Sequence, residues 1–428
     1  MNLWIKNGHV LDPANHLDEV CDVYVKEGKV ACVGSLSSDK IPDECTVIDA
    51  EGKYVMPGLV DLHVHLREPG FEYKETIYSG THAMAKGGFT AVCPMPNTKP
   101  VTDSPAMIEK ILKIAKTDSP IRVYPVGAVT KGQLGEEMTD IAGMVKAGAK
   151  AISEDGKSVM NAEIYREAMK EAKKAGIPVL AHCEDKNMVG HGAMNAGEKA
   201  KKLGICGITN AVEDVIVARD ILLAKETGVH LHLCHCSTKD SVKMVRIAKK
   251  DGVSVSAEVC PHHFAMTEDE IAGDDANYKM NPPLRSAADV EALVDGLADG
   301  TMEAVSTDHA PHGEEEKKQS IAKAPFGIVG SETAYALSVT HLVKTGKLTP
   351  LQLVEKMSTN PCRILSVPGG TLSVGAPADI TIADMDSEYV IDKNTFLSKG
   401  KNTPFDGAKV NGRVYYTIVG GNIVYQYE

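Results

Sequence analysis

The sequence predicts an α/β protein, a (β/α)8 TIM barrel with a small β-sandwich built from both chain termini. Three observations support this fold class. Apolar, β-branched stretches alternate with helix-like segments, polar residues gather where the stretches end, and both termini contain short strands with little helical signal. An open doubly wound sheet is the alternative. No glycine-rich dinucleotide-binding motif follows the first buried stretch, which disfavours that alternative.

The apolar stretches are expected to form the eight barrel strands. They are residues 58–66, 89–97, 121–129, 148–155, 177–185, 229–237, 253–263 and 304–312. Helix signals lie between them. Ser104 and Pro105 are typical of a helix start, and Asn161 and Gly176 are expected to cap the two ends of another helix.

The two ends of the chain differ from its middle. Residues 1–54 and 368–428 contain short strands separated by Gly, Asn-Gly and Asp, whereas residues 55–367 carry the barrel pattern. Two unrelated β appendages are an alternative, but either end alone has too few strands to bury a face. We therefore expect one β-sandwich formed by residues 1–54 and 368–428.

Composition excludes several classes of protein. Of 428 residues, 43% are apolar and 24% charged, as in an ordinary soluble protein. A net charge of −12 without a basic stripe argues against nucleic acid and anionic membranes as partners. No apolar run is long enough to span a bilayer, and the N-terminus lacks the pattern of a signal peptide. Ten cysteines without a C-x-x-C pair indicate reduced thiols, so we expect a cytoplasmic protein.

Histidines and carboxylates at the strand ends predict a metal site. His63, His65 and Arg67 would share one face of an extended strand. A lone histidine pair is more often packed in a core than bound to a metal. Four further ligand-type residues, however, end other strands: Asp155, His182, His235 and Asp308. Six such groups at one rim are hard to explain by packing, and two metals sharing a carboxylate would satisfy them all.

Other ligand-type residues are expected to lie outside this site. Cys234 and Cys236 have the opposite parity to His235 on an extended strand, so we expect them to pack against outer helices, together with His230 and His232.

Three more residues are left outside the metal set. His262 and His263 end the seventh stretch without an identifiable partner, and Glu184 is expected to orient His182. The charged run 312–320 is expected to be a solvated loop, and residues 313–323 to be a mobile segment that orders over ligand.

The motifs as a set resemble those of the bacterial type I dihydroorotases, of the amidohydrolase superfamily. The motifs are DLHVHLREPG, PMPNT, AISEDGK, AHCED, HLCHCST, CPHH, NPPLR and STDHAPH, spread over essentially the whole chain. The two-histidine motif is common to the superfamily, whereas the set is specific. The resemblance implies the barrel with its terminal sandwich. It also implies reversible hydrolysis of (S)-dihydroorotate to N-carbamoyl-L-aspartate, a step of de novo pyrimidine (UMP) biosynthesis.

The resemblance further implies two Zn²⁺ ions per chain. His63, His65 and Asp308 would hold the first, His182 and His235 the second, and Asp155 would bridge them. Asp308 would also act as general base.

The substrate is expected to contact residues at the same rim. They are His65, Arg67, Asn97, Asn281, His312, Phe326 and Gly327. Arg67 would hold the substrate carboxylate with help from Asn97 and His312, because a guanidinium binds a carboxylate in bidentate fashion. Asn281 and the backbone of Phe326 and Gly327 would bond the ring. The alternative for Arg67 is an ion pair with Glu68 or Glu72 at the rim.

Two other functions stay open. Hydantoinases and allantoinases share the barrel and metals but use a carboxylated lysine as bridge. Here Ser153 stands where that lysine is expected, and we expect Lys150 to face solvent. The other alternative is a non-catalytic partner of aspartate carbamoyltransferase, although such relatives have usually lost metal residues. The resemblance is compatible with a homodimer and with an assembly with that transferase.

Overall fold

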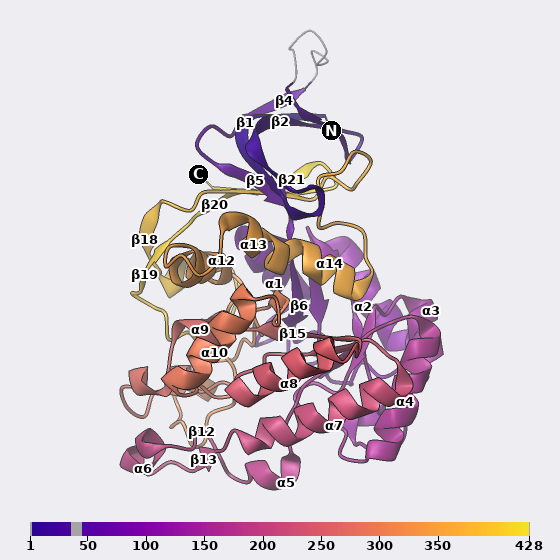
Figure 1. The fold of residues 1–428 in the computed structure, drawn as a ribbon, viewed down its shortest axis with the longest axis vertical. Helices are drawn as coiled ribbons and strands as arrows, with labels where there is room; N and C mark the ends of the chain where they lie inside the picture. Colours follow the sequence, from indigo (N-terminus) through magenta and orange to yellow (C-terminus); the bar gives the residue numbers. More distant parts are fainter. Residues whose placement is uncertain (1, 36–44, 428) are drawn as a thin grey trace.

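The computed structural model describes residues 2–35 and 45–427. Figure 1 shows an α/β body below a β-rich end, and both chain termini lie at the β-rich end. This arrangement agrees with the predicted difference between the middle of the chain and its two ends.

Every stretch predicted to form a barrel strand contains a strand. The strands are β6 (Leu59–Val64), β7 (Phe89–Pro94), β8 (Arg122–Val123), β9 (Val126–Ala128), β10 (Ala151–Ser153), β11 (Val179–Ala181), β14 (Leu231–Leu233), β15 (Val255–Val259) and β16 (Ala304–Val305). The third stretch is split into β8 and β9 around Pro125, which has no N–H to donate. Neighbouring strands pair in parallel, in the orders β6-β7-β8 and β9-β10-β11-β14-β15-β16. Beyond β16, His309 forms an isolated parallel bridge with Val64 at the end of β6.

Helices follow most of these strands. They are α1 (Ile77–Lys86), α2 (Pro105–Asp118), α3 (Ile141–Ala147), α4 (Ala162–Ala175), α7 (Ala211–Thr227), α8 (Lys239–Lys250) and α10 (Ala287–Ala298). Shorter helices are α5 (Lys186–Val189), α6 (Glu198–Leu203), α9 (Pro261–Ala265), α11 (Glu314–Lys317), α12 (Ala334–Ser338), α13 (Pro350–Val354) and α14 (Asn360–Leu365). The predicted caps of α4 are confirmed, because Asn161 accepts from two backbone N–H groups and Gly176 adopts a φ of 73°. Ser104 precedes α2 as predicted, but its side chain makes no capping hydrogen bond.

The core forms on both faces of the parallel strands. Ile152 and Leu231 pack in the large cluster that the strands share with the helices. Ala151 and Leu180, which have the opposite orientation, belong to a separate buried cluster that also includes Cys234. The strands are therefore buried on both sides, as expected for parallel sheets covered by helices.

Strands from both termini form one eight-stranded sheet. Its members are β1 (Leu3–Asp12), β2 (Leu17–Lys26), β3 (Lys29–Gly34), β4 (Thr46–Asp49), β5 (Tyr54–Pro57), β17 (Ile380–Ala383), β20 (Val414–Val419) and β21 (Asn422–Gln426). The antiparallel pair of β5 and β17 joins the N-terminal and C-terminal strands. Two small ribbons stand apart, β12 (Met194–Asn195) with β13 (Gly207–Ile208), and β18 (Glu388–Val390) with β19 (Lys409–Asn411).

Two further features bear on the expectations from composition. Within the described residues, no helix combines the length and apolarity needed to cross a membrane. All ten cysteines are free thiols.

An ion pair joins the terminal sheet to the body. Arg122 on β8 donates to Asp379 through Nε (2.6 Å) and Nη2 (2.9 Å). The same carboxylate accepts from the backbone N–H of Gly420, and the carbonyl of Asp379 accepts from Gly58. Asp379 is buried. Because its side chain and its carbonyl make these bonds together, it links three segments of the chain at one point.

We expect Asp379→Ala to destabilise the protein by about 1–3 kcal/mol, because it removes charge-assisted hydrogen bonds from a partly exposed arginine. The measurement is the midpoint of urea unfolding. Glu167→Ala is the matched control, because it removes an exposed i,i+3 partner of Lys170 and should cost no more than about 0.5 kcal/mol. Equal shifts for the two variants would contradict a linking role for Asp379.

Candidate active site

The six predicted ligand-type side chains lie together at the carboxyl ends of the parallel strands. His63 is on β6, and the other five follow within three residues of the strands β6, β10, β11, β14 and β16: His65, Asp155, His182, His235 and Asp308. All six are buried. The carboxyl ends of parallel strands meet at one edge, which explains why residues so distant in sequence converge.

Asp155 lies at the centre of the cluster. Its Oδ1 is 3.2 Å from His63 Nε2, 3.3 Å from His182 Nδ1 and 3.6 Å from His235 Nε2. Its Oδ2 is 3.6 Å from His65 Nε2. One carboxylate therefore faces all four imidazoles.

Asp308 completes the cluster from the opposite side. Its Oδ1 is 3.0 Å from His65 Nε2 and 3.6 Å from His63 Nε2. Burial opposes the charge of both carboxylates, but the neighbouring histidines outweigh it. The pKa of Asp155 is held well below its usual range by the charge of His63 and by hydrogen bonds from His182 and His235. The pKa of Asp308 is lowered mainly by His65 and His63, so both groups are anionic at neutral pH.

The donor set fits divalent cations. His65 Nδ1 lies 3.0 Å from Asn97 Oδ1, and its Nε2 lies 3.0 Å from Asp308 Oδ1. His182 Nδ1 and His235 Nε2 are only 3.0 Å apart. Both nitrogens of His63 lack a hydrogen-bond partner. Imidazole nitrogens and carboxylate oxygens that crowd together in this way are expected where a cation can bind between them. Two groups of three ligand atoms, from His63–His65–Asp308 and His63–Asp155–His235, each lie within 4.8 Å of one another.

Glu258 on β15 is a buried site residue that the sequence reasoning missed. Its Oε1 lies 3.4 Å from His63 Nδ1, and its Oε2 lies 2.9 Å from His232 Nε2. Burial opposes its charge, but the hydrogen bond from His232 and the charge of His63 lower its pKa. A glutamate within an apolar strand was the available signal, because a buried charge requires a partner.

Asp61 is a second buried site residue that the sequence reasoning missed. It lies in the middle of the buried strand β6 and accepts from the backbone N–H groups of His63 and Thr307. Burial raises its pKa to about 7. Asp61 thereby ties the first strand of the site to the segment that carries Asp308.

The predicted orientation of three residues on the β14 stretch is wrong. His232 is completely buried against Glu258, and Cys234 belongs with His63 and Glu258 to a group of ligand atoms within 4.8 Å. His230 bonds Ser254 and Ser256 instead of an outer helix. The reason is that His235 has a φ of 35°, so the extended-strand alternation ends before His235. Cys236 does pack in the cluster between strands and helices, as predicted.

The ligand-type cluster opens into a cavity of about 170 Å³. All seven predicted substrate-contacting residues line it: His65, Arg67, Asn97, Asn281, His312, Phe326 and Gly327. The cavity lining thus combines one guanidinium, two side-chain amides and backbone groups with the buried carboxylates of Asp155 and Asp308.

Arg67 reaches this cavity by a route that differs from the predicted one. Strand β6 ends at Val64, and Arg67 has a φ of 61°, so it does not continue the strand face of His63 and His65. Its Nε donates to the Pro311 carbonyl at 3.1 Å, and its Nη2 lies 3.4 Å from His312 Nε2. Within the described residues no carboxylate lies within 4.0 Å of Arg67, which argues against the rim pair with Glu68 or Glu72.

Hydrogen bonds position the other cavity residues. Asn97 Nδ2 donates to Asp155 Oδ2 at 3.3 Å, and Asn281 Nδ2 donates to Glu184. His312 Nε2 donates to the Phe326 carbonyl at 2.7 Å. Burial, followed by the charges of Arg67 and Lys74, lowers the pKa of His312 to about 2. His312 is therefore neutral. The Glu184 carboxylate, which was expected to orient His182, accepts this hydrogen bond from Asn281.

Asn402 in the C-terminal segment holds two cavity segments together. Its Oδ1 accepts from the His312 backbone N–H at 3.1 Å. Its Nδ2 donates to the carbonyls of Ala310 (3.1 Å) and Gly327 (3.0 Å). The amide is buried. Sequence reasoning gave no signal for Asn402, because it lies far along the chain from every motif.

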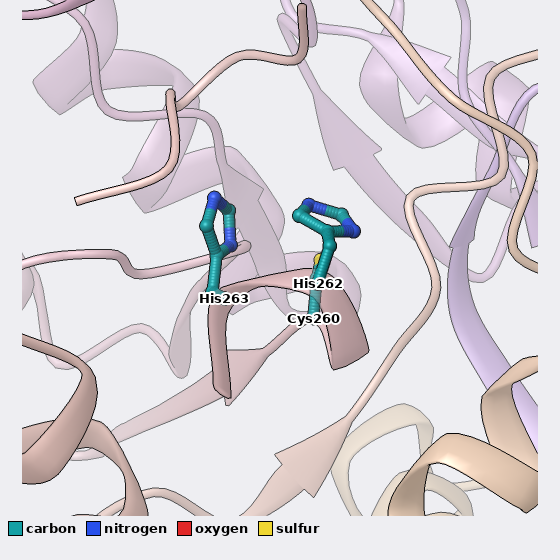
Figure 2. Close-up of side chains that lie close together, drawn as sticks. All are labelled: Cys260, His262 and His263. Atoms are coloured by element: carbon teal, nitrogen blue, oxygen red, sulfur yellow. The ribbon is translucent and has the colours of Figure 1, made fainter. Parts of the chain in front are cut away.

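His262 and His263 lie beside the cavity and not in its lining. Figure 2 shows their two rings rising side by side from the start of α9, with the Cys260 sulfur close to the base of His262. His263 Nε2 donates to the Pro282 carbonyl at 2.9 Å. Burial lowers the pKa of His262 to about 4. His263 thereby supports the turn that presents Asn281 to the cavity.

Lys150 is exposed, as predicted, and does not belong to the ligand cluster. Ser153 is buried, and its Oγ accepts from the backbone N–H of Asp155 at 3.0 Å. Within the described part of the chain, the Asp155 carboxylate is the only group on β10 or just after it that faces the imidazoles.

Comparisons with known proteins agree with this geometry. A family model described as dihydro-orotase-like matches residues 52–241. Over 426 residues the chain is 51% identical to the dihydroorotase of Pelotomaculum thermopropionicum, covering 100% of this chain and 99% of the relative. The chain belongs to the dihydroorotase family. This dihydroorotase-family chain is also 47% identical to the dihydroorotase of Acetivibrio thermocellus, over 98% of each chain.

The dihydroorotase-family chain shares its fold with solved hydantoinase structures. An L-hydantoinase from Arthrobacter aurescens aligns with a TM-score of 0.87 and 29% identity, over 99% of this chain and 96% of that one. A dihydropyrimidinase from Brevibacillus agri aligns with a TM-score of 0.86 over 100% of this chain and 95% of that one; at 23% identity this likeness shows the fold alone. The resemblance inferred from the motifs is confirmed at the level of the family.

The charged run after His312 is only partly solvated, in contrast to the prediction. Lys317, at the end of α11, is buried and donates to the carbonyls of Lys279, Pro325 and Gly327. Its ammonium therefore fixes the segment that carries Phe326 and Gly327. Burial, followed by the charge of Lys279, lowers its pKa to about 7.

This lowered pKa predicts a pH-dependent stability. The lysine has an ordinary pKa of 10.5 when exposed. Above about pH 7 the unfolded chain holds a proton that folded Lys317 lacks, so raising the pH favours the folded state. From about pH 6.5 to about pH 8.5 the urea midpoint of the wild type should therefore gain relative to that of Lys317→Gln. Parallel pH profiles for the two proteins would contradict the lowered pKa.

Proposed function

We propose that this chain is a zinc-dependent dihydroorotase that interconverts (S)-dihydroorotate and N-carbamoyl-L-aspartate in de novo pyrimidine (UMP) biosynthesis. One observation carries the proposal: four imidazoles and two anionic carboxylates cluster at the strand ends, and five of these six groups line a cavity that also holds an arginine without a carboxylate partner among the described residues. The family membership supports the same reaction. The proposed setting is the cytoplasm, with free thiols and a small-molecule substrate.

The proposed architecture is a closed (β/α)8 barrel, residues 55–367, with a sandwich formed by residues 1–54 and 368–428. Barrel closure is supported by the bridge between Val64 and His309 and by the hydrogen bond from His65 N to the His309 carbonyl at 2.9 Å. The shared sheet of β5 and β17 supports the assembly of one unit from both ends.

Two zinc ions are proposed at the ligand cluster. His63, His65 and Asp308 would hold one, His182 and His235 the other, and Asp155 would serve both, since its Oδ1 and Oδ2 face different imidazoles. When bound, zinc supplies hydroxide near neutral pH and polarises the ring carbonyl that is attacked.

Asp308 is proposed as the general base. It is anionic, lines the cavity and lies next to His65. Hydrolysis breaks the ring C–N bond and forms a C–O bond with water. Asp308 would accept the proton from water and return it to the departing ring nitrogen, which leaves the base unchanged at the end of the cycle.

Arg67 is proposed to hold the carboxylate that both reaction partners carry. Its guanidinium is anchored by the Pro311 carbonyl and has no carboxylate partner among the described residues, so donors stay available for a ligand. Asn97 and His312 lie beside it in the same cavity, and Asn281 with the backbone of Phe326 and Gly327 would bond the ring edge.

Hydantoinase or allantoinase activity is the second candidate, suggested by the fold neighbours. The exposed position of Lys150 disfavours it. Assays with dihydroorotate, hydantoin and allantoin side by side test the choice, and turnover of hydantoin above that of dihydroorotate would refute our proposal. A homodimer and an association with aspartate carbamoyltransferase stay predictions from the sequence. Retention of all six ligand-type residues disfavours a purely structural role.

Asp308→Asn should lower dihydroorotate turnover by about 10²–10⁴-fold, the usual contribution of a general base. The measurement is kcat in both directions, with the unfolding midpoint as a check on folding. Asp386→Asn, a change at an exposed aspartate, is the control and should keep wild-type turnover. A near wild-type rate for Asp308→Asn would exclude it as the base.

Arg67→Met should cost about 2–5 kcal/mol in kcat/KM for dihydroorotate, the range for removing one partner of a desolvated charge pair. Any activity on hydantoin, which lacks the carboxylate, should fall far less. Arg246→Met on the exposed face of α8 is the control for loss of a positive charge. Equal losses on both substrates would mean that Arg67 supports the fold or the metal cluster.

Asp155→Ala should lower the metal content from about two ions per chain to about one, because the carboxylate shared by both ligand groups is lost. Elemental analysis after dialysis measures this directly, and most of the activity should disappear with the metal. Lys150→Ala should keep full metal content, with or without bicarbonate during reconstitution. A strict bicarbonate requirement would instead identify a carboxylated Lys150 as the bridge.

A further inference from the structure

A second cavity, of about 390 Å³, adjoins the catalytic cavity. It lies between the α11 segment and the C-terminal segment 393–402, and His312 lines both cavities. We call it the basic cavity, because five lysines line it and Glu314 is the one acid in its lining: Lys317, Lys318, Lys393, Lys399 and Lys401. This concentration of positive charge contrasts with a net charge of −12 for the chain.

Three of the five ammonium groups are bonded to backbone carbonyls and not to carboxylates. Lys399 Nζ donates to the Glu72 carbonyl at 2.7 Å, and Lys401 Nζ donates to the carbonyls of Ser398 (2.8 Å) and Phe396 (2.5 Å). Lys317 is bonded in the same way. Across residues 2–35 and 45–427 none of the three has a carboxylate within 4.0 Å. The charges of Lys399 and Lys401 therefore stay uncompensated, and both side chains keep N–H groups free for a ligand.

The other two lysines are already paired. Lys318 contacts Glu314 at 2.9 Å and Glu315 at 2.8 Å, and Lys393 lies 3.1 Å from Asp406. The attraction for an anion is thus concentrated at Lys399 and Lys401, on the side of the basic cavity formed by the C-terminal segment.

The two reaction partners differ in charge. Dihydroorotate carries one carboxylate, and ring opening creates a second one in N-carbamoyl-L-aspartate. In the catalytic cavity Arg67 matches the carboxylate common to both. Further positive charge, from the lysines of the basic cavity, lies on the far side of His312.

We propose that the basic cavity is a dicarboxylate-binding site that captures N-carbamoyl-L-aspartate next to the catalytic cavity and so lowers its KM in the ring-closing direction. The inference rests on the proposed function. Local positive potential that concentrates an anion raises its association rate and is weakened by salt.

Lys399→Gln and Lys401→Gln test the proposal, with KM and kcat measured in both directions at low and at physiological ionic strength. Each variant should raise the KM for N-carbamoyl-L-aspartate about 2- to 5-fold, the effect expected of a partly exposed charge. The kcat of ring closure should rise in proportion to this KM, because the fixed equilibrium constant allows only equal changes of kcat/KM in the two directions. The kcat and KM for dihydroorotate should stay close to wild-type values, and the salt dependence of the KM for N-carbamoyl-L-aspartate should weaken. Lys399→Arg keeps the charge and should behave as the wild type.

Lys174→Gln is the matched control, because Lys174 is an exposed lysine of α4 outside both cavities. Equal effects of Lys174→Gln and Lys399→Gln, or equal KM changes for both substrates, would overturn the proposal. Calorimetric binding of succinate, a dicarboxylate without the ureido group, is the readout that does not depend on turnover. If the enzyme turned over neither substrate, weaker succinate binding by Lys399→Gln would still support the site, and unchanged binding would reject it.

Discussion

The arrangement of the candidate active site depends on one buried negative charge, the carboxylate of Asp155. Four imidazoles face it within 3.6 Å, from strands that are widely separated in the sequence. Such an anion is tolerated in a buried position only when opposite charge or donors compensate for its lost hydration. The imidazoles at the strand ends and the proposed metals supply that compensation. A second layer beneath it, Glu258 with His232, in turn fixes His63.

The strands and the residue types of the site could be predicted from the sequence, and the orientation of several side chains could not. Parallel strands bring their carboxyl ends to one edge, so His65, Asp155 and Asp308 could be grouped without coordinates. Alternation along a strand, however, holds only while the backbone stays extended. Arg67, His235 and Asp308 all have a positive φ, at 61°, 35° and 47°, so parity counted along the strand fails near them.

Two other features were beyond local patterns. Lys317 belongs to a run of charged residues that is typical of a solvated loop, yet its ammonium is buried because three carbonyls surround it. Such a cage is formed by segments that are apart in the sequence. Asp61 and Glu258 were visible as charges within apolar strands, but only the packing identifies His63 as the group that both of them serve.

Through the buried amide of Asn402, the C-terminal segment supports the wall of the candidate active-site cavity. It bonds His312, Ala310 and Gly327, all of which line the cavity, from a segment far beyond β16 in the sequence. A chain shortened to residues 55–367 would keep every proposed metal ligand and still lose the amide that bonds two segments of the cavity wall to each other. Exchange of the C-terminal part between relatives would therefore also transfer a group that shapes the candidate active-site cavity.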